Sequence, residues 1–418
     1  MKILIPAAVI CITAVCVLAS AYTMDADRTG TETESSGIVS PDIVPSGDIT
    51  AFSWDILGGT GNGNMIFSPY SLYTALAIMA NGAEPGSGTE AEILKALRSD
   101  STGSLNAYLS SLGLENDPGL VSSNMILIDS SVAVNHPLNE EYRKTVSEMY
   151  SCTVSDADFR NSIDSVKKFI QEWVSEKTRG MIPDYESAAD SDTVADIINT
   201  ICLKKEWMHK FDPQNSFKMK FTCGNGTVCS AETMHITLRG ANYYDDGKYR
   251  ALEIPYSDGK SHMTVILPSD GKSLDVLGSW KKETDGYRNS FLKKLSENVP
   301  DRSVSLYLPK LDLSAEYDLE KLLTPMNLSK SFSGCAEYTK IADNYCLKIG
   351  GGKHQAVVRA DEEGTEAAAV TEIVMKCTAM YNPDPVIEFR CDVPFVFMIE
   401  QSGIPLFIGH AYDLSGSE

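Results

Sequence analysis

The hydrophobic and polar positions of the chain change period along its length, and each period predicts a type of element. Residues 197–203 form an almost unbroken apolar run, which is typical of a strand buried on both faces. Residues 164–178 repeat apolar side chains at helical spacing and are predicted as an amphipathic helix. The apolar face of that helix consists of Val166, Phe169, Ile170, Trp173 and Val174. Residues 394–399 and 405–409 are β-rich runs that predict two further buried strands.

One stretch, residues 361–375, combines a strand period with unusually small side chains. Read as a strand, it places Thr365, Ala367, Ala369 and Thr371 on one face, and both glutamates after Gly364 on the other. The first face carries no charge and little volume. Such a segment can enter between two strands of an existing sheet, because its inward face displaces little packed volume and buries no charge.

This stretch resembles the hinge of the reactive-centre loop in serpins, a family of serine protease inhibitors. The residues that carry the resemblance are Glu362, Glu363, Gly364, Thr365, Glu366, Ala367, Ala368, Ala369, Val370 and Thr371. The resemblance implies an α+β fold with a large central mixed β-sheet, further sheets and eight or nine helices. It also implies an exposed reactive-centre loop at about residues 361–385.

Two polar clusters follow from the same resemblance. Ser68 precedes Pro69 and is predicted to cap a helix, and Asn199 lies inside an apolar strand, where it needs a hydrogen-bond partner. The resemblance groups them with Ser71 and His354 in a shutter beneath the centre of the sheet, where His354 would bond to Asn199. The residues implied for the breach, the place where insertion starts, are Trp207, Lys310 and Glu362.

The first residues of the chain predict export. Lys2, an apolar run over residues 3–18 and small residues at 19–21 describe a secretory signal peptide, with an uncleaved N-terminal anchor as the alternative. Residues 22–46 are rich in Asp, Thr, Ser, Gly and Pro and predict a flexible linker. The serpin domain would then occupy residues 47–415, in a protein that is secreted and either free or tethered to the cell surface.

Charge and motifs exclude several function classes. The formal net charge of −21 and the lack of basic clusters argue against binding of nucleic acid or heparin. The sequence contains neither a Gly-x-Ser-x-Gly nor a His-Glu-x-x-His motif, and we expect no enzyme activity, no cofactor and no metal cluster.

Cys223 and Cys229 flank an Asn-Gly pair, which is the preferred two-residue hairpin turn. In an exported chain the two thiols could form a disulfide. A zinc site that also uses His235 is the weaker alternative, because further ligands are missing.

The function implied by the resemblance is single-use inhibition of a serine protease by a monomeric protein. Counting from Glu362 along the family pattern places the reactive bond between Thr378 and Ala379, which would suit an elastase-like or subtilisin-like enzyme. Lys376 would instead attract a trypsin-like enzyme, Met380 or Tyr381 a chymotrypsin-like one, and a cysteine protease stays open as a target. The alternative function is that of a non-inhibitory carrier, storage or structural protein.

Overall fold

The computed structural model describes residues 45–114, 117–342, 352–365 and 386–416. The signal-peptide and linker predictions therefore lie almost entirely outside the described residues. Within the described ranges the chain forms ten α-helices, against the eight or nine that the resemblance implied. The helices are α1 (Ile49–Gly59), α2 (Pro69–Gly82), α3 (Gly88–Ala96), α4 (Thr102–Ser111), α5 (Ser130–Asn135), α6 (Glu140–Tyr150), α7 (Phe159–Lys177), α8 (Val276–Lys281), α9 (Asp285–Ser296) and α10 (Leu319–Leu323). Two short 3-10 helices are η1 (Pro213–Asn215) and η2 (Thr324–Met326).

Two of the sheets form part of the hydrophobic core. The first has six strands in the order β1 (Met65–Phe67), β17 (Ile404–Ala411), β16 (Phe395–Gln401), β10 (Ser261–Pro268), β9 (Tyr249–Pro255) and β8 (Tyr243–Asp245). The second has the order β15 (Ile387–Arg390), β11 (Val304–Pro309), β7 (Val228–Leu238) and β6 (Phe217–Thr222). The predicted strands near the C-terminus are confirmed as β16 and β17, which pair antiparallel with each other.

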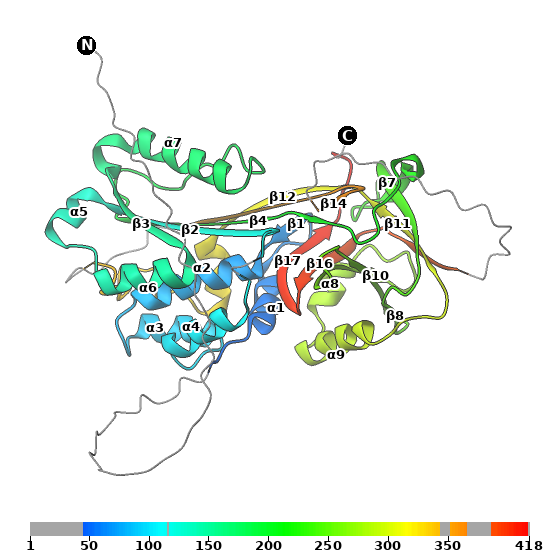
Figure 1. Cartoon of the computed structure of the whole chain (residues 1–418), viewed down its shortest axis with the longest axis horizontal. Coiled ribbons are helices and arrows are strands. Elements are labelled where there is room, and N and C mark those ends of the chain that lie inside the picture. Colours follow the sequence, from blue (N-terminus) through cyan, green and yellow to red (C-terminus); the bar gives the residue numbers. More distant parts are fainter. Residues whose placement is uncertain (1–44, 115–116, 343–351, 366–385, 417–418) are drawn as a thin grey trace, which may run out of the picture. The chain divides into compact units, whose positions relative to one another are not determined.

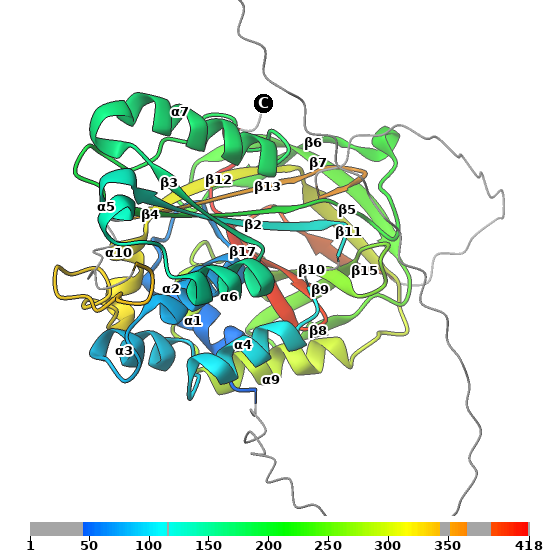
Figure 2. The same ribbon diagram turned by 60° about the vertical axis from the view of Figure 1, so that its left-hand side comes forward.

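The remaining strands form two groups that lie side by side (Figure 2). One group has the order β12 (Leu311–Asp318), β13 (Lys353–Ala360), β14 (Gly364–Thr365) and β5 (Lys205–Glu206). The other has the order β3 (Cys152–Ala157), β2 (Leu120–Asp129) and β4 (Ala195–Leu203). The chain passes from β4 into β5 through a single residue, so the two groups are halves of one layer.

Burial explains why β2 and β4 are apolar on both faces. Met125 of β2 and Ile198 of β4 pack against α7, whereas Ile126 and Ile197 face the core that contains α2. In Figure 1, α7 lies on one side of these strands and α2 with α6 on the other. The buried strand predicted at 197–203 is confirmed by β4.

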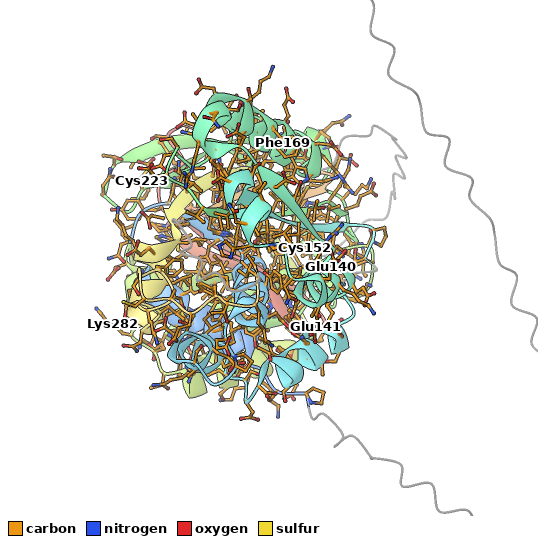
Figure 3. The ribbon with its side chains drawn as sticks, turned by 90° about the vertical axis from the view of Figure 1, so that its left-hand side faces the viewer. Glu140, Glu141, Cys152, Phe169, Cys223 and Lys282 are labelled. Atoms are coloured by element: carbon orange, nitrogen blue, oxygen red, sulfur yellow. The ribbon has the colours of Figure 1, made fainter. Side chains whose placement is uncertain are left out.

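The helix predicted at 164–178 is also confirmed, but its apolar face is narrower than the sequence pattern implied. Val166, Ile170 and Val174 are buried, whereas Phe169 exposes 50% of its surface and is visible at the top of Figure 3. Residues four apart along a helix form one stripe, and Phe169 falls beside that stripe rather than on it. The prediction that Phe169 belongs to the buried face is therefore wrong.

Candidate functional site: a sheet opened at one end

The first residues of the predicted hinge already belong to the sheet. Thr365 of β14 pairs with Ala360 of β13 on one side and with Lys205 of β5 on the other, and Gly364 pairs with Glu206. Both pairings are antiparallel. Within the described residues, β14 is thus two residues long and lies in the gap between the halves of the layer at one end.

A tight turn delivers the chain into that gap. The Asp361 carboxylate accepts hydrogen bonds from the backbone N–H groups of Glu363, at 2.9 Å, and of Gly364, at 3.3 Å. The Asp361 N–H in turn donates to the Gly364 carbonyl at 3.0 Å. A β-carbon added to Gly364 would lie 2.1 Å from the Lys205 carbonyl oxygen, so only glycine permits this approach of the two backbones.

An aromatic stack encloses the threonine that follows. Thr365 is 1% exposed, and its hydroxyl lies 2.5 Å from the Tyr256 hydroxyl. The Tyr256 ring is stacked on Trp207, with ring centroids 4.6 Å apart and planes within 8°. Trp207 donates from Nε1 to the Asp361 carbonyl at 2.8 Å, and its backbone N–H donates to the Glu363 carbonyl at 2.9 Å. The stack therefore holds both the turn and the first inward-facing hinge residue.

Charged side chains fix the glutamate at the start of the hinge. Glu362 is 8% exposed, and its Oε1 lies 2.8 Å from Lys310 Nζ and accepts a 2.7 Å hydrogen bond from the Ser216 hydroxyl. Burial alone would raise the pKa of Glu362, but Lys310 and Ser216 outweigh it and hold that pKa below its ordinary value. Glu362 is consequently ionised and anchored at neutral pH.

A second charged cluster is centred on Lys205 of β5, the residue that pairs with Thr365. The Lys205 ammonium is buried and contacts Asp117 at 2.9 Å, Asp258 at 2.5 Å and the Gln401 side-chain oxygen at 3.1 Å. Burial opposes ionisation of Asp258, yet its hydrogen bonds to Lys205 and Ser261 dominate and lower its pKa to about 2. This cluster fixes the strand with which the hinge pairs.

At the centre of the layer, the residues of the predicted shutter are brought together by the start of α2. Ser68 is the N-cap of α2, as predicted, and its hydroxyl accepts from the Ser71 N–H at 3.2 Å. The Ser68 backbone N–H donates to Nε2 of His354 in β13 at 3.0 Å. Burial lowers the pKa of His354 to about 3, so the imidazole is neutral and acts as an acceptor.

The other half of the layer is held by Ser71. Its hydroxyl donates to the Asn199 side-chain oxygen of β4. The Asn199 amide donates to the Asn124 oxygen of β2 at 2.5 Å, and the Asn124 amide donates to the Tyr150 carbonyl at 2.7 Å. Along the described strands, His354 and Asn199 share no hydrogen bond. The direct bond that the resemblance implied is replaced by a link through the first turn of α2.

This arrangement has no hydrolytic geometry. His354 contacts the backbone nitrogen of Ser68 and not its hydroxyl, and both residues are buried. A general base must reach the proton that it removes from a nucleophile, and this histidine does not. The cluster is suited to holding strands and not to catalysis.

The structure brings the predicted breach residues Trp207, Lys310 and Glu362 to one end of the layer and the predicted shutter residues to its centre. Of the hinge, Glu362 to Thr365 are described, whereas Glu366 to Thr371 and the candidate bonds around Thr378 lie outside the described residues. Sequence reasoning missed several contact residues. They are Asn124, Lys205, Ser216, Tyr256 and Asp361. Only the carboxylate of Asp361, three residues before Gly364, carried a local signal for a turn.

Comparisons with known proteins agree with this geometry. A family model described as "Serpin (serine protease inhibitor)" matches residues 52–414. An uncharacterized serpin-like protein of Methanosarcina acetivorans is 31% identical over 86% of this chain and 84% of its own length. The leukocyte elastase inhibitor of Xenopus laevis is 30% identical over 83% of this chain and 92% of its own length. The native-state crystal structure of the thermophilic serpin tengpin superposes with a TM-score of 0.76 at 25% identity, covering 88% of this chain and 93% of that one.

Proposed function

Because this chain belongs to the serpin family, we propose that it inhibits a serine protease by insertion of its cleaved hinge into the sheet. Family membership supports protease inhibition in general and argues against an enzyme. The observation that carries the insertion mechanism is β14. Two hinge residues occupy the gap between β13 and β5, while β13 and β4 form no ladder with each other along their described lengths.

Strand directions supply the path for the rest of the hinge. β14 runs antiparallel to β13 and to β5, and β4 runs along the chain in the same direction as β5. A segment that continues β14 would therefore run antiparallel to β13 and to β4 and could bond to both. The residues that would face inward after Thr365 are Ala367, Ala369 and Thr371, all small and uncharged.

Mechanistically, the protease serine would attack the carbonyl carbon of the reactive bond and form an acyl ester. The peptide C–N bond breaks, and the new N-terminal amine leaves with the proton of the serine hydroxyl. The freed hinge then inserts and carries the ester-linked protease with it. Each inserted residue gains backbone hydrogen bonds on both sides and buries apolar surface, which drives the step. The breach residues mark its start, and the shutter must separate for it to proceed.

We further propose where the protein acts and which bond its target cleaves. We expect a secreted protein with the reactive bond between Thr378 and Ala379 and an elastase-like or subtilisin-like target. Among the described residues, no helix combines the length and the apolar character needed to span a membrane.

The decisive experiment replaces the first buried hinge residue. Thr365→Arg would place a cation in a site that is 1% exposed and closed by Tyr256, so the hinge can no longer enter the layer. The matched control, Thr365→Ser, keeps the hydroxyl and the small volume. Each protein is incubated with elastase-, subtilisin-, trypsin-, chymotrypsin- and papain-like proteases and analysed on denaturing gels, and mass spectrometry of the released C-terminal peptide locates the cleaved bond.

We expect a denaturant-resistant complex for the wild type and for Thr365→Ser, and cleavage without complex for Thr365→Arg. Undiminished complex formation by Thr365→Arg would refute insertion. Cleavage of the wild type with neither complex nor gain in thermal stability would point to the non-inhibitory carrier.

A further inference from the structure

A candidate metal site lies away from the breach and the shutter. Cys223 follows β6, Cys229 lies in β7, and Asp413 lies in the C-terminal segment after β17. The Cys223 and Cys229 sulfurs are 3.6 Å apart, and Cys223 Sγ is 3.3 Å from Asp413 Oδ1. One ligand atom from each residue lies within 4.8 Å of the other two. We propose that these three side chains bind one zinc-class divalent ion.

The distances match a tetrahedral ion better than a disulfide. Zinc bonds of about 2.3 Å to sulfur and about 2.1 Å to oxygen, at tetrahedral angles, separate two sulfurs by about 3.8 Å and a sulfur from an oxygen by about 3.6 Å. A disulfide would require the sulfurs to approach to about 2.05 Å. The observed spacings therefore need little adjustment for an ion.

The hairpin register points the same way. Phe221 pairs with Cys229, and the Cys223 N–H donates to the Thr227 carbonyl at 2.8 Å, so Cys223 lies diagonally from Cys229 rather than opposite it. Diagonal neighbours in an antiparallel pair have Cα atoms about 7–8 Å apart, whereas disulfides prefer about 4.4–6.8 Å. A metal ion bridges the longer spacing without drawing the backbones together.

Hydrogen bonds to the backbone around Asp413 hold the third ligand in place. The Asn64 side chain accepts from the N–H groups of Tyr412 and Asp413 and donates to the Asp413 carbonyl at 2.6 Å. The Gly224 N–H donates to the Tyr412 carbonyl at 2.8 Å, and a β-carbon on Gly224 would overlap the Tyr412 ring at 1.8 Å. The C-terminal segment is therefore docked on the hairpin turn in a geometry that presents the Asp413 carboxylate to both sulfurs.

Supporting contacts and access also suit an ion. The Leu414 N–H hydrogen-bonds Cys229, and the Ser415 N–H donates to Asp413 Oδ1 at 2.9 Å. Such outer contacts orient metal ligands. Cys223 is buried, whereas Cys229 and Asp413 are half-buried, so an ion could be reached from the solvent side, where a water would complete its coordination. Figure 3 labels Cys223 toward the edge of the folded part.

His235, which the sequence offered as a partner, is not a ligand here. Its ring is stacked on Tyr307 with centroids 4.5 Å apart, and its Nε2 contacts the Ser305 hydroxyl at 3.0 Å. The ligand that the sequence did not suggest is Asp413, because 184 residues separate it from Cys229 (413 − 229). With Asp413 the site has two thiolates and one carboxylate, which are donor types that zinc binds.

The test uses the whole purified chain after reduction, titrated with Co²⁺ and then with Zn²⁺. We expect one Co²⁺ per chain with sulfur-to-cobalt absorption in the near ultraviolet, which Zn²⁺ abolishes. Cys229→Ser should lose that absorption, and Asp413→Asn should weaken binding at least about tenfold. Cys335→Ser, which removes an exposed thiol elsewhere, is the matched control and should bind like the wild type.

Two results would overturn the proposal. One is a reduced chain that binds no metal while the untreated chain shows a Cys223–Cys229 disulfide by mass spectrometry. The other is metal binding that persists unchanged in Cys229→Ser or in Asp413→Asn, with circular dichroism showing that each variant is folded. These readouts do not depend on protease inhibition.

Discussion

The start and the middle of the path proposed for the hinge are closed by different kinds of contact. At the breach, the gap between the two halves of the layer is filled by backbone pairing of β14 and is surrounded by ions and a stacked aromatic pair. At the shutter, the hydrogen bonds that link β4 and β13 run from Asn199 and from His354 to the first turn of α2, as far as the described residues extend.

The difference separates two tasks. In the proposed mechanism, the contacts of the breach fix where the hinge begins, and the neutral hydrogen bonds of the shutter hold β4 and β13 together until the hinge inserts. A buried charged pair weakens when one partner is removed or when its carboxylate is protonated at low pH. The stability that depends on a neutral imidazole begins to decline at milder acidity, because the unfolded chain takes up the proton first. The two regions can therefore be weakened separately.

The largest effect is expected from Lys205→Met at the breach. This change leaves the buried carboxylates of Asp117 and Asp258 without their main cation, and removal of one partner of a buried ion pair costs about 3 kcal/mol or more. Urea titrations followed by tryptophan fluorescence give the free energy of unfolding. Lys260→Met is the matched control, because Lys260 lies 3.4 Å from Asp117 but is 48% exposed, and it should cost less than about 1 kcal/mol. Equal losses in the two variants would contradict a buried role for Lys205.

An intermediate effect is expected at the shutter on lowering the pH. The pKa of His354 is about 3 in the folded chain and about 6.5 when unfolded, so below pH 6.5 the unfolded state binds a proton that the folded state does not. Stability is therefore present above pH 6.5 and falls as the pH is lowered toward 3. This one group should cost about 2 kcal/mol between pH 6.5 and pH 5.

His354→Gln isolates that contribution, because glutamine can still accept from the Ser68 N–H but does not titrate. His410, whose pKa burial lowers to about 4, contributes in the same direction in both proteins and cancels from the comparison. Unfolding at pH 7 and pH 5 should show a smaller loss in the variant. An identical pH dependence would mean that His354 is not the neutral acceptor described.

The smallest effect is expected from Glu362→Gln. Lys310 is 39% exposed, so its pair with Glu362 is screened by solvent and contributes about 1 kcal/mol or less. Because the folded pKa of Glu362 is depressed, this contribution is present above the unfolded pKa of about 4.3 and disappears as the pH falls below it. Thermal unfolding at pH 7 and at pH 3 measures it. Glu363→Gln, which loses a more exposed pair with Lys210, should change stability by only a few tenths of a kcal/mol, and a larger loss there would reverse our ranking.

Local pattern was sufficient for much of the fold. The apolar run at 197–203 became β4, and Ser68 caps α2 with Pro69 in the first turn. The predicted hairpin is formed by β6 and β7, but the two-residue Asn-Gly turn is wrong: the Gly226 N–H donates to the Cys223 carbonyl at 2.8 Å, so Gly224 and Asn225 are the central residues of the turn. The prediction for Phe169 was wrong because helical spacing predicts an apolar face but not how wide a stripe of that face the underlying sheet covers.

The site was less accessible to sequence reasoning because its contacts are distant along the chain. The partner of Thr365 is Tyr256, 109 residues earlier, and nothing around Tyr256 marks it as a contact of the hinge. Asn199 was correctly expected to need a partner, but the choice of Ser71 and Asn124 depends on how α2 and β2 pack. Residue types predicted the need for hydrogen bonds, and tertiary packing selected the atoms.

The close approach of Gly364 to the Lys205 carbonyl has one more consequence, for alignment. Side chains alternate between faces along a strand, so a shift of a single residue would exchange the small, uncharged series for the one that begins with Glu366. Any residue other than glycine at that contact would overlap the neighbouring backbone. Gly364 therefore favours a frame in which the remaining hinge could enter without burying a carboxylate.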